Sequence, residues 1–238
     1  MRNYIILNGT NSNTINGLLI QELAPISKPL MRTEVEQIDG RDGDIVTNLG
    51  FSAYDKEITI GLYGDYDLDE IIAFFNSRGT VIFSNEPDKY YYYQIYAQID
   101  FERLVRYRTA TVSFHVQPFK FSESESARTF NISAGTTSIN ISNNGNIYSK
   151  PAITLYGTGT INLSLNGNQI FVINLGESAN YLTIDATAME AFKDTTDTLM
   201  NRSVDGDYDN FKLDVGLNTI SWSGSLTKIV IENYSRWL

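Results

Sequence analysis

Residues Asp67–Ile99 read DLDEIIAFFNSRGTVIFSNEPDKYYYYQIYAQI, and the first part of this stretch predicts a helix. Its apolar residues recur at helical spacing, at Leu68, Ile71, Ile72 and Phe75. Asp67 suits the N-cap position, and Glu70, three residues later, completes a capping box. Gly79 can take the left-handed conformation in which helices often end. We therefore expect one α-helix between Asp67 and Gly79.

Two strands follow this helix. The segment TVIFS is separated from the tyrosine run KYYYYQIYAQI by a turn at residues 85–88, NEPD. In the run, Tyr91 and Tyr93 share one face with Ile95, Ala97 and Ile99. The other face also carries tyrosines, so it can be offered to a partner, or both faces can be covered as in a core strand.

The last strand of the first half is expected in RYRTATVSFHVQPF. Its apolar side carries Ala110, Val112, Phe114 and Val116. The polar side carries Tyr107 and His115, among others. This alternation predicts a strand with one buried face.

The second half reads as strands throughout. The segments INLSL and QIFVIN meet at Asn166-Gly167, a dipeptide suited to the left-handed torsions of a tight hairpin turn. Further strands are expected in NYLTIDA, LNTISW and TKIVIEN. Their spacing is typical of a two-sheet β-sandwich.

The polar run SESESA at residues 122–127 marks a boundary between two domains, because it offers no apolar residue to a core. We expect an N-terminal domain at 1–127 and a C-terminal domain at 128–238. The fold class is mainly β, with a β-barrel-like or β-sandwich first domain that contains one α-helix. The second domain is a β-sandwich.

The composition excludes several classes of function. The 238 residues include no Cys, which rules out disulfides, thiol nucleophiles and Cys-ligated metals. The net charge of -10 is opposite to the basic surface that nucleic acid requires. The N-terminus has no apolar run long enough for a signal peptide or a membrane span, so we expect a soluble chain made in a cytoplasm, with no membrane partner.

The reactive side chains in the sequence do not indicate an enzyme. His115 is the single His, so no Ser-His-Asp arrangement exists unless it is the base. Asp205, Asp207 and Asp209 resemble the start of a calcium loop, but Asn210 and Gly216 stand where that loop needs Gly and Glu. No phosphate-binding glycine motif is present. We expect no catalytic residues, no cofactor and no metal.

The order of several motifs resembles the distal tail protein (Dit) family of siphophages. The first half carries IDGRDGD at Ile38–Asp44, FFNSRGTVIFSNEPDKYYY at Phe74–Tyr92 and VSFHVQPFKF at Val112–Phe121. The second half carries NGNIYSKPAITLYGTGTINLSLNG and, near the C-terminus, LNTISWSG. The resemblance implies an N-terminal ring-forming domain and a C-terminal galectin-like sandwich.

The resemblance also implies a structural function. In that family six copies form a hub ring that joins the tail tube protein to the tail-tip protein and can seat receptor-binding proteins. DNA passes through the central channel without specific binding, and the protein lies in the virion at the tail tip. Acidic or neutral walls suit such a channel, because basic walls would hold phosphates. The acid-rich stretch Glu34–Asp44 and the helix-start acids, Asp65, Asp67, Asp69 and Glu70, are candidates for its lining.

Two groups of residues are candidates for contacts between subunits. The first is Arg41, Asp42 and Gly43, which we place at a hairpin tip that bears both charge signs. The second is the basic cluster Arg103, Arg106 and Arg108 before the last strand of the first domain. This cluster could pair with acidic residues of the next subunit or of another tail protein.

A carbohydrate-binding module that recognises a host cell-wall glycan is the alternative function. A sugar site needs an aromatic platform, and Trp222 and Trp237 are the two Trp residues that could stack on a sugar ring. Buried core positions are the other interpretation of both. Galectins bind galactosides through a set that includes His, and the C-terminal half contains no His.

Overall fold

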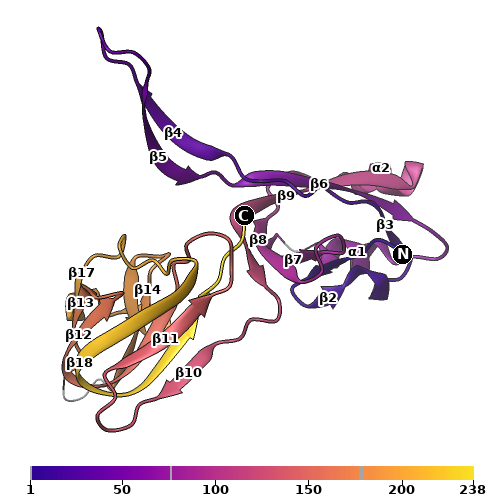
Figure 1. Cartoon of the computed structure of the whole chain (residues 1–238). Coiled ribbons are helices and arrows are strands. Elements are labelled where there is room, and N and C mark those ends of the chain that lie inside the picture. Colours follow the sequence, from indigo (N-terminus) through magenta and orange to yellow (C-terminus); the bar gives the residue numbers. More distant parts are fainter. Residues whose placement is uncertain (1, 76, 177–179) are drawn as a thin grey trace. The chain divides into compact units, whose positions relative to one another are not determined.

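The computed structural model describes residues 2–75, 77–176 and 180–238. The chain forms two compact units (Figure 1). Unit 1 comprises Met1–Glu123 with Leu238, and unit 2 comprises Ser124–Trp237. Most residues lie in strands, so the mainly β class is confirmed. No helix in the described ranges is long and apolar enough to cross a membrane.

Unit 1 is built on one antiparallel sheet of seven strands. Their spatial order is β2-β1-β7-β8-β9-β6-β3. The strands are β1 (Ile5–Leu7), β2 (Thr10–Asn11), β3 (Leu18–Glu22), β6 (Tyr54–Leu62), β7 (Arg78–Phe83), β8 (Lys89–Gln94) and β9 (Thr109–Ser122). A short 3-10 helix, Ser12–Thr14, follows β2. Two further strands, β4 (Met31–Glu36) and β5 (Ile45–Phe51), pair with each other apart from this sheet.

The core of unit 1 follows the alternation expected from the sequence. Ile58 and Ile60 on β6 stand opposite Val112 and Ala110 on β9, and all four are buried. On β8, Tyr91 and Tyr93 are buried while Tyr92 is exposed. The buried face predicted for residues 110–116 is therefore confirmed, because a strand that packs one side turns every second residue inward.

Helix α1 (Leu68–Phe74) begins where the sequence predicts. The Asp67 carboxylate accepts hydrogen bonds from the backbone N–H groups of Asp69 and Glu70, at 3.0 and 3.2 Å. The predicted role of Gly79 was wrong, because the helix ends at Phe74 and Gly79 lies in β7. A Cβ there would lie 1.8 Å from the Asn8 side-chain oxygen, so close packing explains this glycine.

A second helix, α2 (Phe101–Tyr107), was not predicted, and its last two residues lie in the segment expected as strand. Asp100 caps it by accepting a hydrogen bond from the Arg103 N–H at 2.8 Å. Leu104 is its one buried residue, so its helical apolar periodicity is weak. The expectation of a single helix was incomplete for that reason, and the strand expected to include Tyr107 begins at Thr109.

Unit 2 is a sandwich organised by two long strands that pair with each other along most of their length. Its strands are β10 (Arg128–Asn131), β11 (Ser138–Asn143), β12 (Ala152–Leu165), β13 (Asn168–Asn174), β14 (Tyr181–Asp185), β15 (Glu190–Lys193), β16 (Thr195–Leu199), β17 (Val204–Gly206) and β18 (Gly216–Glu232). A 3-10 helix, Asn201–Ser203, precedes β17.

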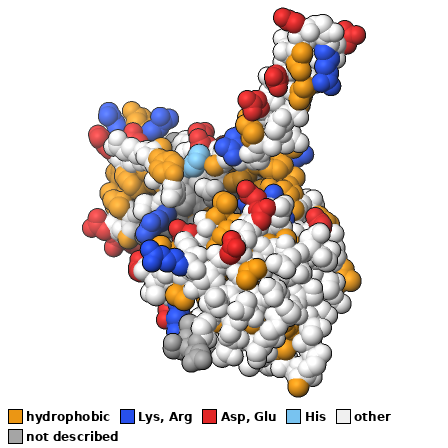
Figure 2. Space-filling view, turned by 90° about the vertical axis from the view of Figure 1, so that its left-hand side faces the viewer, with side chains coloured by type: hydrophobic (Ala, Val, Ile, Leu, Met, Phe, Trp, Pro, Cys, Tyr) orange, Lys and Arg blue, Asp and Glu red, His pale blue; other side chains and the backbone are white. Residues whose placement is uncertain are grey.

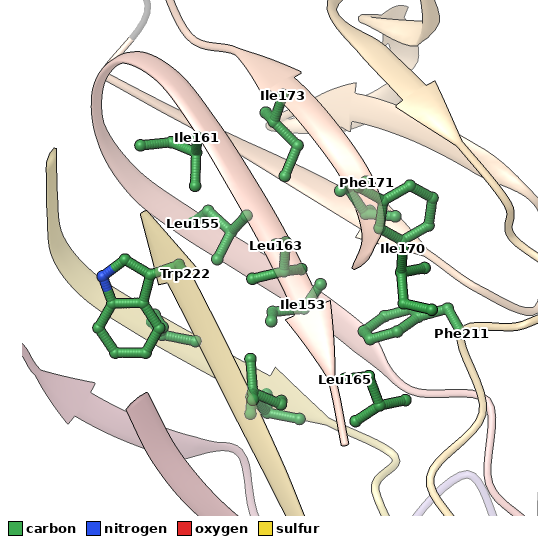
Figure 3. Close-up of a cluster of buried hydrophobic side chains, with 14 of the residues drawn as sticks. Ile153, Leu155, Ile161, Leu163, Leu165, Ile170, Phe171, Ile173, Phe211 and Trp222 are labelled. Carbon is green, nitrogen blue, oxygen red and sulfur yellow. The ribbon is translucent and has the colours of Figure 1, made fainter. Parts of the chain in front are cut away.

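The long strands β12 and β18 contribute to both layers of the sandwich. The first part of β12 pairs with β14 and with the end of β18, and its last part pairs with β13 and with the start of β18. Leu155 and Leu163, on either side of the bend in β12, point into the same core (Figure 3). The Asn166-Gly167 hairpin between β12 and β13 is confirmed, since both residues have positive φ, 50° and 87°.

Glycine at position 224 makes the matching bend in β18 possible. Gly224 has φ +102°, and a Cβ there would lie 2.4 Å from the Thr160 carbonyl oxygen. We expect Gly224→Ala to lower the free energy of unfolding by about 1–3 kcal/mol, because backbone strain and a backbone clash would combine. Urea unfolding followed by circular dichroism measures this change.

Gly159→Asn is the matched control for this variant. Gly159 also has positive φ, +75°, but it has open space where a Cβ would lie, and Asn tolerates this conformation. Equal losses for the two variants would mean that the clash with Thr160 contributes nothing.

Candidate assembly surfaces

The most exposed element of unit 1 is a hairpin formed by β4 (Met31–Glu36) and β5 (Ile45–Phe51). These strands pair with each other and form a two-stranded sheet of their own. Figure 1 shows the hairpin extending away from the seven-stranded sheet. A two-stranded hairpin is at best marginally stable in water by itself, so one that projects freely is an element suited to contact with a partner.

One face of the hairpin, here called its apolar face, carries Met31, Val35 and Val46, and the other carries the charged residues of β4 together with Ile45, which pairs with Glu36. Val35 and Val46 stand directly opposite each other on the apolar face, with exposed fractions of 53% and 56%. Met31 lies on the same face and is also exposed. Arg32, Glu34 and Glu36 lie on the other face. Figure 2 shows the hydrophobic and charged side chains along the free hairpin.

The predicted contact residues Arg41, Asp42 and Gly43 lie at the tip of this hairpin. The Arg41 N–H donates to the Ile38 carbonyl oxygen at 3.1 Å, which closes a tight turn. Gly43 has φ +78°, a conformation that favours glycine. All three residues are exposed, and the tip carries both charge signs as expected. Their contact with a neighbouring subunit stays a prediction.

The root of the hairpin is held by side chains of the main sheet. Three of them donate hydrogen bonds to the backbone of the segment that enters β4. Asn85 donates to Ala24 O at 3.0 Å, Lys56 to Pro25 O at 2.9 Å and Tyr54 to Ser27 O at 3.3 Å. On the returning strand, the Phe51 and Phe119 rings meet edge to face at 5.6 Å. The hairpin is therefore anchored at its root and exposed along its length.

The anchoring Lys56 belongs to a buried charged cluster. Lys56 is 2% exposed and lies over the Phe83 and Tyr91 rings, at 5.3 and 5.2 Å. Glu86 accepts hydrogen bonds from the Lys120 ammonium at 2.7 Å and from the Tyr91 hydroxyl at 2.6 Å. Burial lowers the pKa of Lys56 and raises the pKa of Tyr91. The cluster contains two cations, Lys56 and Lys120, and one anion, Glu86. Its charge balance therefore depends on Glu86.

The buried tyrosines predict a loss of stability at alkaline pH. Burial raises the pKa of Tyr54, Tyr91 and Tyr93. Above pH ~10, the unfolded chain loses these protons while the folded chain keeps them. Their stabilising contribution is complete below that pH and falls as the pH rises further. Burial of Lys56 has the opposite effect on the pH dependence of stability, because it lowers the pKa of that ammonium. This effect applies below pH ~10.4 and comes from one group, against three tyrosines.

We expect an alkaline titration to show two phases of phenolate absorbance. Exposed tyrosines among the 15 in the chain ionise first, and the buried ones ionise together with the loss of the β-sheet circular dichroism signal. A single phase that is complete while this signal is unchanged would contradict the prediction.

The second predicted cluster, Arg103, Arg106 and Arg108, lies on and after α2 and is exposed. Arg103 and Arg106 line a shallow groove of about 650 Å³ together with Asp100, Glu102, Tyr107 and Thr109. The Arg106 guanidinium lies 5.5 Å from the Tyr107 ring centroid, and Arg108 lies 5.1 Å from that of Tyr66. These cation–π pairs hold the guanidinium groups at a partly apolar surface, where they remain able to donate hydrogen bonds.

The aromatic platform required by a glycan site is not formed by Trp222. Trp222 is 6% exposed and belongs to the core of unit 2 (Figure 3). Its proposed role in sugar stacking was wrong, because its ring is enclosed by core side chains. Trp237 is half-buried, and its role stays a prediction.

The remaining chemical candidates are occupied by local structure. His115 Nδ1 lies 2.7 Å from Asp55 Oδ1, across the β6–β9 pair. The Asp207 carboxylate accepts hydrogen bonds from the N–H groups of Asp209 and Asn210, so this run forms a turn. Within the described part of the chain, no group of three or more His, Asp or Glu side chains is placed to hold a metal ion.

The apolar residues of the hairpin are the functional candidates that the sequence analysis missed. Glu34–Asp44 were expected only as an acidic stretch, and no role was predicted for Met31, Val35 or Val46. The signal was the alternation in MRTEVE, which is typical of a strand with one apolar face. That this face stays uncovered in the folded chain could not be seen in the pattern.

Comparison with known proteins finds one matching family model and several similar folds. Residues 10–116 match the model described as the phage tail protein RIFT-related domain. The fold is similar to that of the SPP1 Dit (gp 19.1) protein, with a TM-score of 0.63 and 16% identity over 100% of both chains. A chain of the activated phage p2 baseplate with strontium gives a TM-score of 0.50 and 12% identity over 96% of this chain and 97% of that one. None of the curated proteins matches the sequence.

Proposed function

We propose that this chain is a phage tail structural protein of the siphophage distal tail type and that six copies of it close into a hub ring at the tail tip. The ring joins the tail tube protein on one side to the tail-tip protein on the other. Receptor-binding proteins can be seated on it. The SPP1 Dit protein, whose fold this chain resembles, is described as a paradigm of the hub adsorption apparatus in phages that infect Gram-positive bacteria, which supports this assignment.

The hairpin β4–β5 is the observation that carries the proposal. It exposes an apolar face of Met31, Val35 and Val46 on an element too small to be stable alone. Such a face is a liability for a monomer, because it invites aggregation unless a defined partner covers it. A contact between two different surfaces of identical subunits closes a ring when the rotation is right, which gives each copy one donor and one acceptor surface.

The acidic balance of the chain supports a channel through which DNA passes. With a net charge of -10, the protein has little general attraction for phosphates. In this proposal the hub guides DNA without binding it, and its role is structural. In this proposal the protein resides in the virion at the tail tip, after synthesis in the host cytoplasm.

The mass of the purified protein tests the ring. Six copies of 26.8 kDa make an assembly of about 160 kDa, measured by light scattering after gel filtration. Negative-stain images of the same peak should show six-fold rings with a central hole. A mass near 26.8 kDa at every concentration would contradict self-assembly into a hub.

A further inference from the structure

We propose that the β4–β5 hairpin of one copy docks on the α2 end of unit 1 in the next copy. We call the receiving region the Arg–Tyr surface and define it by Arg2, Tyr63, Arg103, Arg106, Tyr107 and Arg108. The inference rests on the proposed ring and names the two surfaces that form its repeating contact.

The Arg–Tyr surface is one continuous region of unit 1. The Arg2 guanidinium lies 4.9 Å from the Tyr63 ring centroid and donates to Leu18 O at 2.7 Å. The Leu62 N–H, next to Tyr63, donates to Arg108 O at 3.3 Å. Arg106 and Tyr107 directly precede Arg108. These contacts join the end of β6, the chain start and α2 into one patch.

The hairpin and the Arg–Tyr surface lie at opposite ends of β6. Tyr54, the first residue of β6, helps to hold the hairpin root, and Leu62, the last residue, contacts Arg108. The nine residues of this strand separate its ends by about 27 Å. Because the hairpin is anchored at its root, we infer that it reaches the Arg–Tyr surface of another copy and not its own. This gives the head-to-tail arrangement that a ring requires.

The two surfaces are complementary in chemistry. Tyr63 and Tyr107 are exposed, at 49% and 63%, and Val105 beside them is exposed as well. They offer aromatic and aliphatic area to the Val35–Val46 face of the hairpin. Tyr and Arg are also the residue types that most often dominate the energy of interfaces.

Opposite charges accompany the apolar areas. Seven charged residues lie along the hairpin and its tip, five acidic and two basic: Arg32, Glu34, Glu36, Asp39, Arg41, Asp42 and Asp44. The receiving surface presents four arginines. Asp100 and Glu102, at the start of α2, line the groove with Arg103 and Arg106, and Asp100 is used as the helix cap. Such complementarity fixes the register of the contact and speeds the encounter of subunits.

The absence of Cys from the chain allows a direct test by crosslinking. We would prepare Glu36→Cys and Arg106→Cys separately, mix them and add a short bismaleimide. We expect crosslinked dimers in the mixture and few in either protein alone. The variant with both substitutions should form a ladder that ends at six copies. Asp88→Cys, exposed at the β7–β8 turn of the same unit, is the control partner and should not crosslink to Glu36→Cys.

Charge exchange provides the second arm of the test. We expect E34R with E36R, and separately R103E with R106E, each to raise the apparent dissociation constant of the ring at least ~30-fold, because like charges then face each other. The chain with all four substitutions should recover assembly.

The outcomes separate this inference from the proposed function. Six-fold rings that form without the Glu36–Arg106 crosslink, or that are insensitive to R103E with R106E, would overturn the pairing and leave the ring intact. Crosslinks between two Glu36→Cys chains in place of the mixed pair would also overturn it. An unchanged chain that stays at one copy would overturn both proposals.

Discussion

A chain carrying Val35→Asp and Val46→Asp is expected to remain at 26.8 kDa under conditions in which the unchanged chain forms the six-copy assembly. The two valines face each other across the hairpin, so both new carboxylates would be enclosed when a neighbour covers that face. An unpaired charge taken out of water costs several kcal/mol at each contact. The ring repeats that cost six times, and light scattering should find no ring at micromolar concentrations.

The fold of each chain should survive this change. Both valines are more than half exposed, and substitutions at such positions usually alter the free energy of unfolding by about 0.5 kcal/mol or less. Circular dichroism and urea unfolding check this point. The matched control is Val35→Thr with Val46→Thr, which keeps the β-branched shape and should weaken the ring much less. A full ring in the Asp variant would show that the apolar face lies outside the contact.

The largest effect on stability is expected for Glu86→Ala. Its carboxylate accepts hydrogen bonds from Lys120 and Tyr91 in the buried cluster beneath the hairpin root. Removing it leaves Lys120 and Lys56 without their anion, and breaking a buried ion pair from one side typically costs about 3–5 kcal/mol. Urea unfolding of the variant should show this loss, and heating should show a lower Tm.

Asp88→Ala is the matched control within the same turn. Asp88 pairs with Lys89, but its side chain is 72% exposed, so the free energy of unfolding should change by no more than about 0.5 kcal/mol. Adding Lys120→Met to Glu86→Ala should recover part of the stability, because one of the two uncompensated ammonium groups is then gone. Equal effects of Glu86→Ala and Asp88→Ala would show that the cluster contributes little.

Several elements could be predicted because their signals are local. Asp67 and the apolar spacing after it predicted α1, and Asn166-Gly167 predicted the β12–β13 hairpin. Alternation from Ala110 to Val116 identified the buried face of β9. In each case neighbouring residues carry both the signal and the interaction that forms the element.

Other features were not predicted, because their sequence signals were weak or fitted more than one interpretation. Helix α2 has a single buried residue, Leu104, so the alternation of the following strand masked it. Gly79 was assigned to a helix end from its residue type alone, whereas contact with Asn8, 71 positions earlier in the chain, explains it. Trp222 offered two interpretations, and its enclosure by the core of unit 2 selects the buried one.

The sequence by itself determined the mainly β class, the position of α1, the exclusion of thiol chemistry and the resemblance to a phage tail protein family, since these depend on residue types and on short-range patterns. Tertiary structure alone decided that Val35 and Val46 stay exposed, that Lys56 anchors the hairpin root, and that the arginines around α2 lie at the far end of β6 from the hairpin. The reason is physical: whether an apolar face is covered, and which charges meet, depends on pairing between strands distant in the chain, and residue order does not record that pairing.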